Sequence, residues 1–137
     1  MLEFRVWSFS FRIPKSAIHI QIMSKEELKI RYKAFALRVM KMVEALPSGL
    51  SADVIAKQVV RCATSVAANY RAACRARSKA EFIAKLGIVE EEADETLFWL
   101  EMIEEAELLP ASRLEALKTE ANEIVAITVT SIKTAKK

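Results

Sequence analysis

Apolar side chains recur at steps of three and four residues along four long stretches of this chain. This spacing places them on one face of an α-helix, where a strand would need strict alternation. Only two glycines and three prolines interrupt 137 residues, of which 53% are hydrophobic. A chain of this length can bury a core of its own. The sequence therefore predicts one all-α domain.

The first helix is predicted at 24–46, with Ser24 as its N-cap, and it ends at the Pro-Ser-Gly run of 47–49. The second helix is predicted at 51–76, with Ser51 as its N-cap. The small side chains on this second helix would allow another helix to approach closely, and some of that surface is expected to meet a neighbour. They belong to Ala63, Ala67, Ala68, Ala72 and Ala73.

The third helix is predicted at 78–108, where Ser78 and Glu81 form a capping box. The fourth helix runs to the C-terminus, with Ser112 and Glu115 as a second candidate capping box. Short links between long helices favour antiparallel neighbours. The expected architecture is an up-down-up-down four-helix bundle over 23–137. Its predicted core residues are Leu28, Phe35, Val39, Met42, Leu46, Ile55, Val59, Cys62, Val66, Ala73, Phe82, Leu86, Val89, Ala93, Leu97, Leu100, Ile103, Leu114, Leu117, Ala121, Ile124, Thr128 and Ile132.

Residues 1–22 do not share the helical pattern. Apolar and polar residues alternate there and Pro14 interrupts them, which is typical of an extended segment. Two interpretations stay open. The segment is either an extension upstream of a natural start at Met23, or an arm that pairs with a neighbouring subunit.

Charge is distributed unevenly along the chain, although its net charge is only +3. The third helix region, 78–108, holds ten acidic and two basic residues, whereas every other region carries a net positive charge. Such a helix can pair with basic helices inside one subunit or between subunits. Pairing between subunits would form a ring in which each acidic face meets a basic neighbour.

Several kinds of chemistry find little support in the residues. A di-iron bundle needs a Glu-x-x-His step on two helices, and the only histidine, His19, lies outside the predicted bundle. Arg12 and His19 match the spacing of one class of helical ribonuclease, but across Pro14 they would not share a helical face. No catalytic residue, metal or cofactor is therefore predicted.

Cys62 and Cys74 would lie about 18 Å apart on one helix, which is too far for a disulfide. Both are expected to be buried free thiols. The sequence contains neither a signal peptide nor an apolar run of membrane-spanning length, so a cytoplasmic protein is expected.

A polar network is predicted between the second and third helices. Arg61, Ser65 and Asn69 are spaced four residues apart on one side of a half-buried helix, so they need partners. Glu92 and Glu95 lie at the depth required to meet Arg61. The network would either fix the register of the two helices or line a binding groove.

Four basic residues cluster where the second helix turns into the third: Arg71, Arg75, Arg77 and Lys79. Clustered cations beside Tyr70 are typical of a surface that contacts phosphates of RNA or DNA. The other interpretation is a solvated bundle end that also neutralises the helix dipole.

Several segments together resemble a known family: 35–39, 46–47, 65–70, 77–82 and 92–97. They are similar to the bacterial four-helix-bundle proteins encoded in intervening sequences of large-subunit ribosomal RNA genes. The resemblance covers about Met23 to the end. Many members carry a glutamate shortly after the asparagine equivalent to Asn69, and this chain does not.

The resemblance implies an antiparallel bundle that assembles into a homopentameric ring. A relative, the accessory variability protein of diversity-generating retroelements, binds nucleic acid and a reverse transcriptase. The expected function is a non-enzymatic, self-assembling bundle that binds RNA or DNA through basic surface. The alternative is a protein-binding scaffold whose basic residues serve subunit contacts alone.

Overall fold

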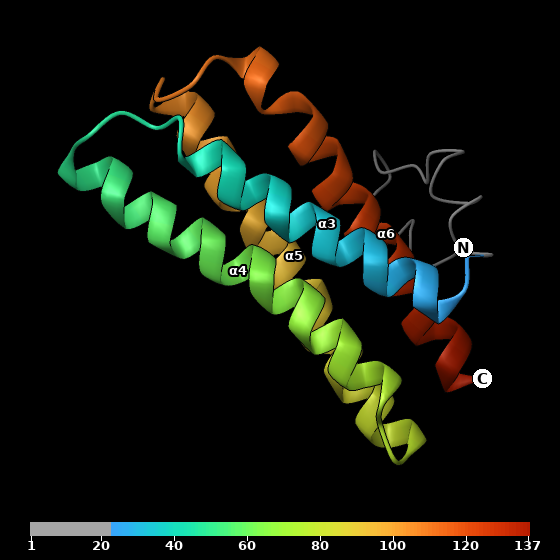
Figure 1. The fold of residues 1–137 in the computed structure, drawn as a ribbon. Coiled ribbons are helices and arrows are strands. Elements are labelled where there is room, and N and C mark those ends of the chain that lie inside the picture. Colours follow the sequence, from blue (N-terminus) through green and yellow to red (C-terminus); the bar gives the residue numbers. More distant parts are fainter. Residues whose placement is uncertain (1–22) are drawn as a thin grey trace.

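The computed structural model describes residues 23–137, and they form four antiparallel helices (Figure 1). These are α3 (Lys25–Val43), α4 (Leu50–Cys74), α5 (Lys79–Glu105) and α6 (Glu115–Lys136), with one 3-10 turn, η1 (Ala111–Arg113), before α6. No strand occurs between residues 23 and 137. The predicted four-helix bundle is confirmed. The predicted extended segment, 1–22, lies outside the described residues.

Two predicted serine caps are present. The Ser24 hydroxyl accepts a hydrogen bond from the Glu27 backbone N–H at 3.1 Å, and the Glu27 carboxylate accepts one from the Ser24 N–H at 2.8 Å. This is a complete capping box at the start of α3. At α5 the Ser78 hydroxyl accepts from the Glu81 N–H at 3.0 Å, which is the serine half of the predicted box.

The two other predicted caps are wrong. α4 begins two residues early, at Leu50, because Gly49 and not Ser51 takes the N-cap position, with φ 152°, and Ser51 falls inside the first turn. α6 begins after Leu114 and not after Ser112, and no side chain caps it. Residues 111–113 form the 3-10 turn instead, and Leu114 is fully buried, so its packing sets the start of α6.

Three helices end earlier than predicted. α4 stops at Cys74, two residues before the predicted end at Ala76. α3 stops at Val43 because the next three N–H groups each bond to a carbonyl three residues back, which tightens the last turn. α5 stops at Glu105, and Glu107 has a left-handed φ of 58° that reverses the chain.

The core contains the predicted apolar faces. Most of the predicted core residues are buried, and the others, Leu46, Phe82, Leu97 and Ile132, are partly buried against them. Two tyrosines that were not predicted in the core, Tyr32 and Tyr70, are also buried. Their rings lie 5.0 Å apart in an edge-to-face contact that joins α3 to α4. Within 23–137, no helix has an apolar stretch that would cross a bilayer.

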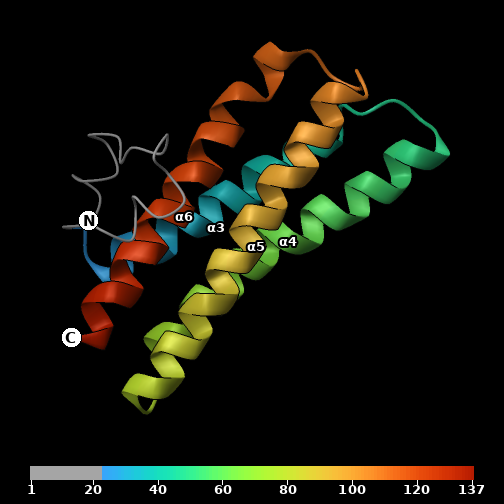
Figure 2. The same cartoon turned by 180° about the vertical axis from the view of Figure 1, so that it is seen from behind.

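The helices follow one another around the bundle, each packed against the next in sequence. α3 and α4 lie together on the side seen in Figure 1, and α5 lies on the side seen in Figure 2. The start of α3, the α4–α5 turn and the end of α6 meet at the same end of the molecule (Figure 1).

Phe35 tests the contribution of this core. Phe35 is fully buried, so Phe35→Ala should lower the free energy of unfolding by about 3–5 kcal/mol through lost burial and a cavity. Val54→Ala is the control, because Val54 is 49% exposed and should change stability by less than about 0.5 kcal/mol. Urea unfolding followed by circular dichroism measures both, and equal effects would contradict the core assignment.

Candidate nucleic-acid interface and polar network

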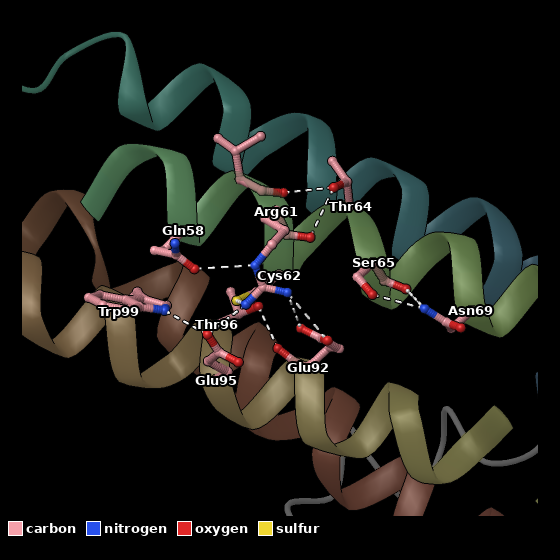
Figure 3. A network of polar contacts seen from close by, with 11 residues as sticks. Gln58, Arg61, Cys62, Thr64, Ser65, Asn69, Glu92, Glu95, Thr96 and Trp99 are labelled. Carbon is pink, nitrogen blue, oxygen red and sulfur yellow. Dashed lines mark hydrogen bonds and ion pairs between the residues drawn. The ribbon is translucent and has the colours of Figure 1, made fainter. Parts of the chain in front are cut away.

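Arg61 of α4 reaches across to α5 and contacts two glutamates there (Figure 3). The Nη1 atom of Arg61 lies 3.2 Å from Glu92 Oε1, and its Nη2 atom lies 2.7 Å from Glu95 Oε2. The predicted contact between these three side chains is confirmed. Because the Arg61 side chain is 48% exposed, each ion pair stabilises the fold by at most about 1 kcal/mol.

Glu95 also accepts a hydrogen bond from the indole N–H of Trp99 at 3.0 Å. This bond is the main cause that lowers the pKa of Glu95, and the hydrogen bond and positive charge of Arg61 add to it. Trp99 was not predicted as a member of this network. Trp99 follows Glu95 by four residues on the same helix, and this spacing was the sequence signal that could have predicted the contact.

Ser65 and Asn69 form a separate pair on α4 (Figure 3). The Asn69 amide donates to the Ser65 backbone carbonyl at 3.0 Å and to the Ser65 hydroxyl at 2.9 Å. The five residues expected to form one network therefore form two groups, an ion-pair cluster between helices and a local pair on one helix.

Cys62 lies beneath the ion-pair cluster and is fully buried. Its sulfur, together with carboxylate oxygens of Glu92 and Glu95, offers three possible metal ligands within 4.8 Å of one another. Burial raises the pKa of Cys62 to about 12, so the thiol stays protonated, whereas metal binding needs a thiolate. The Arg61 guanidinium also donates to all three groups, so it supplies the positive charge there. These residues therefore form an ion-pair cluster and not a metal site.

Ion pairs that sequence reasoning missed join α6 to its neighbours. Arg31 of α3 binds Glu120 and Glu123 of α6 with three contacts of 2.7 Å. Lys118 of α6 binds Glu104 of α5 at 2.5 Å. These residues carry no distinctive motif, and only the packing of α6 between α3 and α5 brings them together.

The start of α3, the α4–α5 turn and the end of α6 lie at one end of the bundle (Figure 1), and each of them carries basic residues. Lys29 and Lys33 of α3 face the same groove as Arg71 and Arg75 of α4. The Lys25 ammonium lies 4.8 Å from the ring centre of Phe82, next to the start of α5. We call this surface the basic end. It consists of Lys25, Lys29, Lys33, Arg71, Arg75, Arg77, Lys79, Lys136 and Lys137.

The four predicted phosphate-contacting residues divide between two places on this surface. Arg71 and Arg75 line the groove between α3 and α4, whereas Arg77 and Lys79 lie exposed at the α4–α5 turn. Arg77 approaches Glu81 at 3.8 Å. Among residues 23–137, no acidic side chain forms an ion pair with Lys33, Arg71, Arg75 or Lys79. The lysines from α3 and α6 could not be placed here from sequence, because they are distant along the chain.

The lowered pKa of Glu95 predicts a pH dependence of stability. A carboxylate whose pKa is lower in the folded state contributes stability above its ordinary pKa of 4.5 and loses it as the pH falls through the folded value. Glu95→Gln should therefore lower the free energy of unfolding by up to about 1 kcal/mol at neutral pH and leave it unchanged in strong acid. Urea unfolding at several pH values tests this. Glu91→Gln is the control, since Glu91 is exposed on the same helix, and a pH-independent effect of Glu95→Gln would contradict the assignment.

Cys62 should be unreactive in the folded protein. In a Cys74→Ser background, iodoacetamide should modify folded Cys62 about 100-fold more slowly than the urea-unfolded chain, because the thiol is buried and protonated. Mass spectrometry of timed samples gives both rates. Similar rates would show that the thiol is accessible.

Comparisons with known proteins agree with this architecture. Residues 26–130 match the family model described as 23S rRNA-intervening sequence protein. A crystal structure of a protein of unknown function from the S23 ribosomal protein family of Bacteroides thetaiotaomicron VPI-5482 is 33% identical in sequence, with a TM-score of 0.74. The match covers 81% of this chain and 99% of that chain. A comparison with curated proteins gives no significant match. The family predicted from the helix motifs is confirmed, and the chain belongs to the 23S rRNA-intervening sequence proteins.

Proposed function

We propose that this protein is a non-enzymatic helical bundle that assembles into a homopentameric ring and binds RNA or DNA through its basic end. The convergence of cations from three helix ends and one turn carries the nucleic-acid part of this proposal. Clustered lysines and arginines bind nucleic acids by neutralising phosphates and releasing counterions. Cations without acidic partners remain available for that contact.

The self-assembly part rests on exposed apolar surface and on the family resemblance. Ile30, Leu37 and Met40 of α3 are 70%, 56% and 43% exposed, and they follow one another along one face of the helix. A contiguous apolar surface of this kind marks an interaction site in a soluble protein. The ring size of five comes from the resemblance.

The alternative function is a protein-binding scaffold without a nucleic-acid role. Arg71 and Arg75 favour it, because they line an apolar groove and could serve contacts between proteins. The resemblance also predicts a protein partner, such as a reverse transcriptase, and a relation to the retroelement accessory protein. Both remain predictions. The cytoplasmic location also remains a prediction.

Arg77→Glu combined with Lys79→Glu tests the nucleic-acid proposal. Both residues lie outside the groove, so the native mass of the assembly should not change. The affinity for a fluorescent single-stranded RNA or DNA of mixed sequence should fall about tenfold or more, since two phosphate contacts become repulsive. Wild-type affinity should also fall steeply between about 50 and 200 mM salt. Fluorescence anisotropy measures binding, and mass photometry measures the assembly.

Arg38→Glu combined with Arg113→Glu is the matched control. Arg113 lies in the turn before α6, at the opposite end of the bundle, and Arg38 lies in the half of α3 nearer that end. Both are exposed, and the change in charge is identical. The control should bind like the wild type. Equal losses in the two variants, or wild-type binding that ignores salt, would contradict a specific role of the basic end. An assembled wild type with no nucleic-acid binding would favour the scaffold.

A further inference from the structure

α3 and α4 line an open groove of about 730 Å³. The two helices lie side by side in Figure 1. Ile30, Leu37 and Met40 of α3 form its apolar wall. Alanines of α4 form its floor, and their short side chains leave the groove deep. Small residues on one helix let a further helix approach closely. The groove therefore has the shape and the apolar surface that would receive a helix.

The rim of this groove is positively charged. Lys33 of α3 and Arg71 and Arg75 of α4 line it, and none of them forms an ion pair within residues 23–137. Its only acidic residue, Glu26, lies 2.6 Å from Lys29 and is neutralised by it. We call this feature the cationic groove. A helix that fits here would present acidic side chains beside an apolar anchor.

The outer face of α5 carries that combination. Its exposed residues are spaced three, four and seven apart, so they form one stripe along the helix. The acidic stripe consists of Glu91, Asp94, Phe98, Glu101, Met102 and Glu105. None of its four carboxylates forms an ion pair within the described part of the chain.

Phe98 supplies the apolar anchor of this stripe. Its side chain is 48% exposed, and its ring packs edge-to-face on Trp99 at 4.9 Å, which restricts its position. Aromatic side chains with restricted positions are frequent hot spots of binding energy in protein interfaces. Met102, one turn further along, extends the apolar surface at 36% exposure.

We propose that the acidic stripe of one copy packs into the cationic groove of the next copy. This inference rests on the proposed self-assembly and names the surfaces that produce it. It assigns Lys33, Arg71 and Arg75 to the contact between copies. Arg77 and Lys79, which lie outside the groove, then carry the proposed contact with phosphates. The two surfaces match in sign, and each has apolar residues at its centre. They also match in length, since 14 residue steps separate Glu91 from Glu105 and Glu26 from Met40, about 21 Å of helix in each case.

The arrangement makes each contact head-to-tail. α3 and α4 face one side of the molecule and α5 faces the other, so a copy uses different surfaces toward its two neighbours (Figure 2). Such heterologous contacts form a closed ring when the rotation between copies closes. A head-to-tail pair of copies would still leave one groove and one stripe uncovered, and further copies would cover them.

Charge reversal on each surface, alone and combined, tests this contact. The groove variant carries Lys33→Glu, Arg71→Glu and Arg75→Glu, and the stripe variant carries Glu91→Lys, Asp94→Lys and Glu101→Lys. Each variant alone places like charges across the contact, so the dissociation constant of the assembly should rise by about 100-fold or more. The chain with all six substitutions restores opposite charges and should regain the wild-type native mass.

Native mass spectrometry and analytical ultracentrifugation give the assembly, and circular dichroism with thermal melting confirms that each variant is folded. Arg38→Glu, Arg77→Glu and Arg113→Glu together form the control for the groove variant, and its mass should equal that of the wild type. The proposed contact would be overturned if the groove variant and the stripe variant both kept the native mass of an assembled wild type. It would also be overturned if the chain with all six substitutions did not regain that mass. A monomeric wild type would instead overturn the proposed self-assembly itself.

Discussion

The burial of four apolar helix faces in one core sets the position of every other feature of this protein. Phe35, Val59, Leu86 and Ile124, one from each helix, are fully shielded from solvent. Because each helix contributes a face, the helices must lie side by side, and their short links make neighbours antiparallel. That arrangement brings the start of α3, the α4–α5 turn and the end of α6 to the same end of the bundle, and it decides which polar faces point outward.

The packing also sorts the charges of the chain. Between neighbouring helices, opposite charges pair: Arg31 with Glu120 and Glu123, Arg61 with Glu92 and Glu95. The Arg61 pairs are partly exposed and contribute little to stability, whereas the side chains of the Arg31 pairs are mostly buried. Both groups remove charge from the sides of the bundle. What remains is an excess of cations at one end and an excess of acids along α5. The proposed nucleic-acid contact and the proposed contact between copies both follow from this residual polarity.

Local sequence signals succeeded where the chemistry was local. Ser24 and Ser78 cap their helices because a serine three residues before a glutamate can satisfy free backbone donors without any tertiary contact. Ser51 and Ser112 failed because a helix start also depends on its surroundings. A glycine conformation at Gly49 and the burial of Leu114 decided the two starts. The Arg61 contact was predictable because a tight turn fixes the depth at which α4 and α5 face each other.

The sequence by itself determined the helices, their antiparallel order, the family and the imbalance of charge among the helices, because periodicity and caps act over a few residues. Only the tertiary structure decided which distant residues meet. It placed lysines of α3 beside the arginines of α4, it separated Ser65 and Asn69 from the Arg61 cluster, and it left a groove above the alanines of α4. The physical reason is that helix rotation and spacing come from the fit of side chains across the core, which no single stretch of the chain contains.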